Sequence, residues 1–329
     1  MNDLFDKAKK KRKKSEYSAK DIEVLEGLEP VRRRPGMYIG GSDEAAMQHL
    51  VAELLDNAMD EAVAGEANRI EIHLEASNTI TISDNGRGIP VGPHPKYKTK
   101  SALEVIMTSL HSGGKFGGKA YKISGGLHGV GLSVVNALSE SLKVEVIRNG
   151  KLWSQNYTKG NPVTELKECG PKNKRKGTSI TFTPDFDIFP KDARFRPQQL
   201  YKMARSKAYL FKGIEVRWTC NPTLLKKGDA TPEKDRLHFP GGLLDYLAYK
   251  MEGFTPLNVT PFSGQAPINR SDGNIEWAIS WSNESDGFIE SFCNTVPTPL
   301  GGTHEVGLRN ALTKGLRSYG ALINNKQAA

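Results

Sequence analysis

The sequence contains few cysteines and no long apolar run. Cys169, Cys220 and Cys293 are the three cysteines among 329 residues, and their wide separation matches no disulfide framework or zinc-site spacing. Such cysteine usage favours a reducing compartment, and we expect the cytoplasm. No apolar stretch approaches the roughly 18 residues of a membrane span, and the basic N-terminus lacks the apolar core of a signal peptide, so we expect no membrane partner.

Positive charge is abundant and unevenly distributed. The net charge is +9, and basic residues cluster at 7–14, 32–34 and 172–177. These clusters fit either a solvated tail with exposed loops or attraction to a polyanion such as nucleic acid. No aromatic or groove-reading motif accompanies them, so charge alone supports nucleic-acid binding only weakly.

The length of the chain favours two domains. We expect a basic, disordered tail over 1–20, a first domain over 21–220, and a second domain over 221–329 that is short enough to be a fragment. Hydrophobic periodicity predicts helices over 21–31, 49–62, 102–112, 132–139, 197–211, 241–251 and 301–320. Alternation predicts strands within 68–89, 142–158, 177–184, 213–220, 274–283 and 287–298, with a polar linker over 221–236.

One predicted helix, "HLVAELLDNAMDEA" over 49–62, carries an unusually acidic face. At 100° per residue its apolar side chains gather on one side, and the opposite side collects Glu53, Asp56, Asn57, Asp60 and Glu61. Most charged helix faces simply meet water. The alternative is a site that needs carboxylate and amide groups one turn apart.

The window "SDNGRGIP" places Asp84 at the end of a predicted strand. Asp-Asn-Gly is a strong signal for a tight turn, and a turn is the simplest interpretation. A carboxylate at a strand end can also accept a hydrogen bond from an exocyclic amine. Gly86 and Gly88 would then let the backbone approach a flat ring.

Two glycine-rich windows follow. In "KISGGLHGVGLS", over 122–133, glycines precede an apolar helix, which suits a phosphate site better than a flexible linker. It is no dinucleotide fingerprint, because Val134 occupies the third glycine position. In "GGKFGGKA", over 113–120, Ala120 replaces the magnesium-binding hydroxyl of a P-loop, and a helix precedes the window, so a P-loop is excluded. Lys115 and Lys119 could still contact phosphates or simply be solvated.

Together these windows supply what hydrolysis of a nucleoside triphosphate requires: an amine acceptor, a phosphate-binding loop, and a helix with a base and an amide oxygen. Glu53 would polarise the attacking water, and His49, one turn before it, would orient its carboxylate. Asn57 would offer its amide oxygen to Mg²⁺, which takes few protein ligands beside phosphates and water. Catalysis of this kind depends mainly on positioning and charge stabilisation.

The order of three motifs, "ELLDNAMDE", "DNGRG" and "GGLHGVG", resembles the GHKL ATPase superfamily. The longer stretches "IEVLEGLEPVRRRPGMYIG", "VIMTSLHSGGKF" and "GGTHEVGLRNAL" are similar to the B subunits of bacterial type IIA topoisomerases, and this resemblance covers nearly everything from Tyr17 onward. The sequence of these stretches is more similar to that of topoisomerase IV subunits, and gyrase subunits are the near alternative. Chaperone, mismatch-repair and sensor-kinase members of the superfamily fit less well.

The resemblance implies an α+β fold. The first domain would be a Bergerat-type α/β sandwich, with helices on one face of a mixed sheet. The second would be the beginning of a transducer domain of the ribosomal protein S5 domain 2-like type. The family's γ-phosphate-sensing lysine finds no match before Ala329, so we expect good ATP binding and poor hydrolysis from this stretch alone.

The resemblance also implies roles for individual residues. Glu53 would be the general base and His49 its orienter, with Asn57 as the Mg²⁺ ligand. Asp84 would bind the adenine amine near Thr178, and Arg87, paired with Glu61, would flank the ring. The residues implied in nucleotide binding are Tyr17, Ile22, Asn57, Asp84, Arg87, Gly88, Ile89, Pro90, Lys115, Tyr121, Gly126, Leu127, His128, Gly129, Val130, Gly131 and Thr178.

The implied partners extend beyond ATP and Mg²⁺. Tyr17 and Ile22 match the arm that reaches into the nucleotide site of a second copy when two protomers dimerise. The family implies DNA and a separate DNA-cleaving A subunit, assembled as a heterotetramer in the bacterial cytoplasm. Arg148 matches the arginine that coumarin inhibitors contact. The implied activity is ATP-driven clamp closure for duplex passage, with decatenation and relaxation, or negative supercoiling in a gyrase.

Overall fold

A computed structural model describes residues 18–114, 129–171, 175–268, 273–284 and 287–325. Its first part is built on a nine-stranded mixed sheet with the order β5-β4-β3-β7-β2-β1-β8-β9, and β6 pairs with β4. The strands are β1 (Arg69–Leu74), β2 (Ile80–Asp84), β3 (Ser139–Arg148), β4 (Lys151–Thr158), β5 (Asn161–Pro162), β6 (Lys167–Pro171), β7 (Gly177–Pro184), β8 (Glu215–Cys220) and β9 (Lys234–Leu237).

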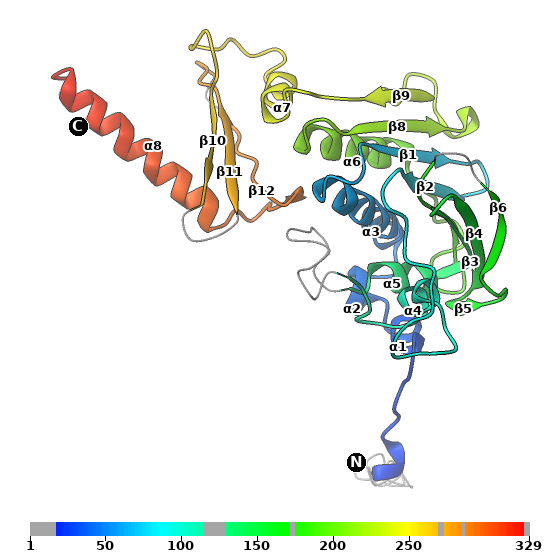
Figure 1. Cartoon of the computed structure of the whole chain (residues 1–329). Coiled ribbons are helices and arrows are strands. Elements are labelled where there is room, and N and C mark those ends of the chain that lie inside the picture. The colour runs from blue at the N-terminus through cyan, green and yellow to red at the C-terminus, as the bar shows by residue number, and fades with distance from the viewer. Residues whose placement is uncertain (1–17, 115–128, 172–174, 269–272, 285–286, 326–329) are drawn as a thin grey trace, which may run out of the picture.

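Helices cover one face of this sheet, as Figure 1 shows. They are α1 (Glu29–Arg33), α2 (Gly36–Ile39), α3 (Glu44–Val63), α4 (Ala102–Thr108), α5 (Gly131–Ala137) and α6 (Pro197–Leu210). The apolar side of α3 buries Leu54, Leu55 and Met59 in the same core as Ile72 and Ile80 of the sheet. Periodic burial on α3 and alternating burial on β1 produce the predicted α/β sandwich.

Strand register brings distant parts of the sequence together at one end of the sheet. β2 is antiparallel to β7, with Ser83 opposite Ser179. The end of β2 at Asp84 therefore lies beside the start of β7 at Gly177 and Thr178. The carboxyl end of β2 and its following loop thus meet the first residues of β7.

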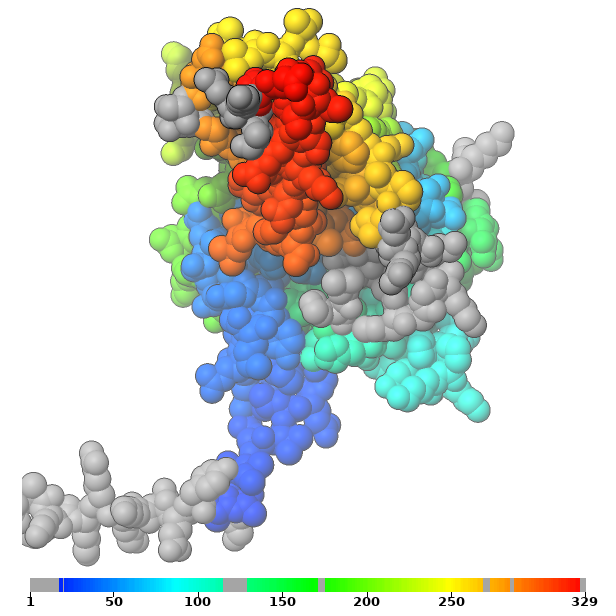
Figure 2. Space-filling model, turned by 90° about the vertical axis from the view of Figure 1, so that its left-hand side faces the viewer, coloured from blue at the N-terminus to red at the C-terminus, as the bar shows by residue number. Residues whose placement is uncertain are grey.

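The second part of the chain contains α7 (Leu243–Lys250), a hairpin of β10 (Phe262–Pro267) and β11 (Asn274–Ile279), a short hairpin of β12 (Phe292–Cys293) and β13 (Val296–Pro297), and α8 (Thr303–Leu322). Figure 2 shows α8 in red along the face turned to the viewer. The junction with the first part holds an aromatic cluster in which Tyr209 stacks on Phe239 with 3.7 Å between ring centroids. Arg205 lies over the ring of Tyr249 at 4.0 Å.

Several local expectations were wrong. The predicted helix over 21–31 is reduced to α1, preceded by a 3₁₀ turn at Ala19–Asp21, and Gly27 adopts a positive φ of 60° between them. The expected linker contains β9, which pairs with β8 and extends the sheet past residue 220. β10 lies where a loop was expected, and in place of the strand expected over 287–298 there is a short hairpin of two two-residue strands. We therefore propose that the first domain continues through Leu237.

The basic cluster at 32–34 has a structural contact. Arg32 donates to the carbonyl oxygen of Ala137 at 2.5 Å and pairs with the carboxylate of Asp185 at 2.6 Å. The Asp185 side chain is 1% exposed. Burial alone would raise the pKa of Asp185, but hydrogen bonds from the Asp187 amide and Arg32 hold that pKa below its usual value. Arg32 thus fastens α1 to the body of the first domain.

Among the described residues, no helix has the length and apolar character needed to cross a bilayer.

Candidate functional site

The polar face of α3 places His49, Glu53 and Asn57 on successive turns. His49 Nε2 lies 3.5 Å from Oε1 of Glu53, and this carboxylate raises the pKa of the imidazole. The amide nitrogen of Asn57 donates to the carbonyl oxygen of Glu53 at 2.8 Å. Because this bond engages the nitrogen, the amide oxygen is the atom of Asn57 suited to a cation. The helix therefore presents a held carboxylate and a held amide one turn apart.

Gly131, the first residue of α5, lies against Glu53. A Cβ atom at Gly131 would overlap Oε2 of the Glu53 carboxylate. Gly129 and Val130 precede it, and Gly129 has a positive φ of 61°. The last residue of the "GGLHGVG" window, Gly131, therefore lies beside the carboxylate of Glu53 on α3.

Asp84 ends β2 in a partly buried position. Its Oδ1 accepts the Gly86 amide at 2.7 Å. Burial raises the pKa of Asp84 to about 7, against the opposing effect of the hydrogen bond from Gly86. Gly177, with φ of 135°, passes so close that a Cβ there would overlap the carbonyl oxygen of Asp84. A carboxyl group poised near neutral pH is characteristic of functional sites.

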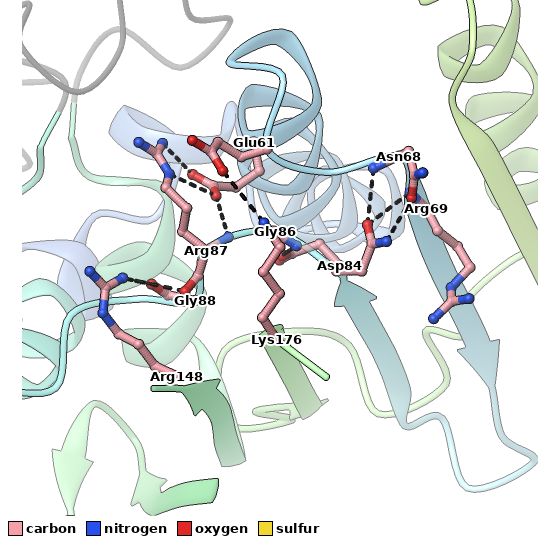
Figure 3. Close-up of polar contacts among 11 residues, drawn as sticks. Glu61, Asn68, Arg69, Asp84, Gly86, Arg87, Gly88, Arg148 and Lys176 are labelled. Carbon is pink, nitrogen blue, oxygen red and sulfur yellow. Dashed lines mark hydrogen bonds and ion pairs between the residues drawn. The ribbon is translucent and has the colours of Figure 1, made fainter. Parts of the chain in front are cut away.

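The loop after Asp84 is held from α3 by an ion pair. Glu61 accepts hydrogen bonds from the backbone amide and the guanidinium of Arg87, with 2.8 Å between Glu61 Oε1 and Arg87 Nη2. Figure 3 shows this contact together with Asp84 and Gly86. A Cβ at Gly86 would lie 2.6 Å from Oε2 of Glu61, so the loop requires glycine there. The pairing of Arg87 with Glu61 that the resemblance implied is confirmed.

The following residues contact β7 and β3. The Ile89 amide donates to Oγ1 of Thr178 at 3.2 Å. Arg148 donates to the carbonyl oxygen of Gly88 at 2.5 Å, as Figure 3 also shows. Pro90 is exposed beyond them. The structure therefore brings Asp84, Arg87, Gly88, Ile89, Thr178 and Arg148 into one cluster at the end of the sheet.

Some predicted site residues lie elsewhere. Ile22 is 60% exposed on the N-terminal stretch, which extends away from the sheet in Figure 1. Tyr17, Lys115, Tyr121, Gly126, Leu127 and His128 lie outside the described residues.

Sequence reasoning missed three residues around the site. Gly177 permits the close approach of β7 to Asp84, and only the "KG" before "TSI" hints at it. Asn85 accepts the amides of Asn68 and Arg69 through its side-chain oxygen and so fixes the turn. Lys207 of α6 is buried and pairs with Asp56 of α3 at 2.6 Å. Burial raises the pKa of Asp56 although Lys207 opposes that shift.

A separate acidic cluster is a poor candidate for a metal site. Glu140, Asp185 and Asp187 converge, but the ammonium group of Lys159 lies within 3.7 Å of a carboxylate oxygen of each. The Lys159 ammonium group therefore already neutralises charge at the place where a metal ion would bind. Among the described residues, the amide oxygen and carboxylates of α3 remain the better candidates for a metal that also binds phosphates.

Comparison with known families matches both parts of the chain. The profile described as "Histidine kinase-, DNA gyrase B-, and HSP90-like ATPase" matches residues 42–188. The profile described as "DNA gyrase B" matches residues 242–328. The first range contains Glu53, Asp84 and Gly131, and the second contains α7 and α8.

Individual proteins similar to this chain come from the same family as the matched profiles. The B subunit of DNA topoisomerase 4 from Caulobacter vibrioides is 55% identical over 95% of this chain and 45% of its own length. The B subunit of DNA gyrase from Staphylococcus epidermidis is 44% identical over 92% of this chain and 46% of its own length. The 43K ATPase domain of Thermus thermophilus gyrase B, solved with an aminocoumarin, superposes with a TM-score of 0.77 at 34% identity, over 90% of this chain and 74% of that one. The chain spans about half the length of these curated relatives.

Proposed function

This chain belongs to the GHKL ATPases, among the B subunits of bacterial type II topoisomerases, and from that premise we propose that the polar face of α3 and the loops beside it bind Mg²⁺-ATP and hydrolyse it. The observation that carries the proposal is the convergence of three sequence windows. Glu53 of α3 lies against Gly131 of the "GGLHGVG" motif, and Glu61 of α3 forms an ion pair with Arg87 of the "DNGRG" motif. A single helix therefore organises the whole cluster.

Glu53 is the proposed general base. His49 supports this role because it lies against one carboxylate oxygen and can donate to it, which orients the other oxygen. The contact with Gly131 supports it further, since Glu53 lies against the last residue of the stretch proposed to hold the phosphates. We propose that Lys115 and the residues 126–131 contact the triphosphate.

Asn57 is the proposed Mg²⁺ ligand. Its nitrogen is held by the Glu53 carbonyl, which fits an oxygen directed to a hard cation. Magnesium would neutralise the charge of the triphosphate when bound. The role of this chain is to hold that oxygen one turn from the base.

Asp84 is the proposed adenine acceptor, with Thr178 beside it. Gly86 and Gly88 carry no side chain that would block a ring, and Arg87 is kept in place by Glu61. We propose that Arg87, Gly88, Ile89 and Pro90 line one side of the ring, and that Tyr121 contacts the nucleoside. Arg148, which donates to the Gly88 carbonyl, is the proposed contact for coumarin-type inhibitors.

The whole protein would use this site to drive a clamp. We propose that Tyr17 and Ile22 reach into the nucleotide site of a second copy, that the dimer closes on DNA, and that a DNA-cleaving A subunit completes a heterotetramer. Ile22 is 60% exposed, so its apolar surface is accessible to a second copy, and burying it there would be favourable. The higher identity to the topoisomerase 4 relative than to the gyrase relative supports decatenation and relaxation over supercoiling.

The test is nucleotide binding and turnover by wild type, Glu53→Ala and Asp84→Ala in the presence and absence of Mg²⁺. Loss of a general base costs roughly 100-fold or more in turnover, so Glu53→Ala should bind ATP normally and turn it over at that reduced rate. Asp84→Ala should lose binding. Normal turnover by Glu53→Ala would refute the base assignment. Decatenation outpacing supercoiling in the assembled enzyme would support topoisomerase IV over gyrase.

A further inference from the structure

One buried lysine connects the helix of the nucleotide site to the second part of the chain. Lys207 lies on α6 with 7% of its surface exposed. Its ammonium group pairs with Oδ1 of Asp56 on α3 at 2.6 Å, and it donates to the carbonyl oxygen of Thr295 at 2.9 Å. Asp56 adjoins Asn57 in the sequence. Lys207 therefore links Asp56 and Thr295, two residues that lie 239 positions apart in the sequence.

The carbonyl that Lys207 binds is presented by a tight hairpin turn that places a threonine at positive φ. Asn294 and Thr295, the two central residues of the β12–β13 hairpin, have positive φ of 48° and 72°. A β-branched residue rarely adopts this conformation, and it persists only where surrounding contacts favour it. The turn aims the Thr295 carbonyl at the first part of the chain, and Figure 1 shows the second part approaching α3 at β12.

The base of the same hairpin is tied to α8. Ser291 Oγ lies 2.7 Å from Thr298 Oγ1 and donates to the carboxylate of Glu305 at 3.1 Å. Thr298 also lies 3.2 Å from His304 Nε2. Contacts therefore run without interruption from Asp56 through Lys207 and the hairpin to the first turn of α8.

We propose that Lys207 is a positioning residue that couples the nucleotide helix α3 to the second part of the chain through the β12–β13 hairpin. The inference rests on the proposed nucleotide site. Asn57 and Glu53 sit on the same helix as Asp56, so a ligand that shifts α3 displaces the carboxylate that holds Lys207. A buried ammonium group cannot leave both acceptors without a large desolvation cost, so the hairpin follows. The hairpin then carries the shift to α8.

The experiment measures amide hydrogen exchange of the hairpin, residues 291–298, in the full chain with and without a non-hydrolysable ATP analogue and Mg²⁺. Wild type should bind the analogue and change the exchange of the hairpin several-fold. Lys207→Met should bind within about twofold of wild type, exchange the hairpin about tenfold faster without ligand, and lose the response to ligand. Lys202→Met, at an exposed position of the same helix, is the matched control and should behave as wild type.

Two further variants keep the test decisive. Asp56→Asn with Lys207→Met removes both charges, which preserves folding where the single variant unfolds, and it should also lose the ligand response. Thr295→Gly keeps the carbonyl and suits the positive φ, so it should retain the response. A hairpin that still responds to ligand in the double variant overturns the coupling, and so does a wild-type hairpin that ignores bound ligand. Failure of wild type to bind the analogue would instead refute the proposed function.

Discussion

Gly131 lies so close to Glu53 that position 131 has no room for a side chain while the glutamate is present. Gly131 begins α5, Glu53 lies in the middle of α3, and a Cβ on the glycine would overlap the Oε2 oxygen of the carboxylate. The two residues come from separate sequence windows with separate expected roles, phosphate binding and base catalysis. Their contact gives the glycine a second function, which is to leave room for the carboxylate.

Replacing Gly131 should therefore damage catalysis more than binding. Gly131→Ala must push Glu53 away from its position beside His49, and we expect turnover to fall at least about tenfold, since misplacement by an ångström can cost far more. Binding of adenine at Asp84 should change little. Steady-state ATPase assays and equilibrium binding of ADP separate these effects. Gly315→Ala on α8, where a Cβ meets nothing within 4 Å, is the control, and equal losses in both variants would contradict the prediction.

Gly177 should be equally intolerant of substitution, for a structural reason. Gly177→Ala would place Cβ onto the carbonyl oxygen of Asp84 at a φ of 135°, so the start of β7 must move. Such backbone strain and overlap cost on the order of 2–3 kcal/mol. Urea denaturation would measure the loss in the free energy of unfolding. Gly92→Ala, where space is open, should stay within about 0.5 kcal/mol of wild type, and unchanged stability of Gly177→Ala would argue against this contact.

Local patterns explain which parts of this fold were predictable. The periodicity of α3 and the alternation of β1 and β2 depend on neighbouring residues, and both elements form as expected. The approach of Thr178 to Asp84 depends on β2 pairing with β7, and no local pattern encodes that register. The motif resemblance supplied this part of the site, whereas Lys207 has no motif. Its pairing with Asp56 and Thr295 follows only from the packing of α6 between two distant segments.

Arg32 should stabilise the fold instead of binding a polyanion. Arg32→Met leaves the buried carboxylate of Asp185 without its closest charged partner, at 2.6 Å, and leaves it with the Asp187 amide at 2.9 Å and the more distant ammonium group of Lys159 at 3.7 Å. Breaking a buried pair costs about 3 kcal/mol or more. Chemical denaturation should show that loss, whereas exposed Arg34→Met should be nearly neutral. If both variants keep full stability and both weaken DNA binding, the polyanion interpretation of this cluster would be favoured.

The raised pKa of Asp84 predicts a pH-dependent stability. Its pKa is about 7 in the folded protein, against 3.8 for an ordinary aspartate, so the folded state binds the extra proton between about pH 4 and 7. Stability from this group is therefore fully present below about pH 4 and is lost as the pH rises through 7. Asp84→Asn carries no titrating proton and keeps an oxygen that can accept the Gly86 amide. Relative to wild type, its free energy of unfolding should rise by about 2 kcal/mol between about pH 5 and 7 and level off above about pH 8.

Urea titrations at each pH measure this difference, with exposed Asp192→Asn as the control. A difference that stays constant across this pH range would mean that Asp84 is ionised throughout, and the buried-carboxyl account of the adenine site would then fail.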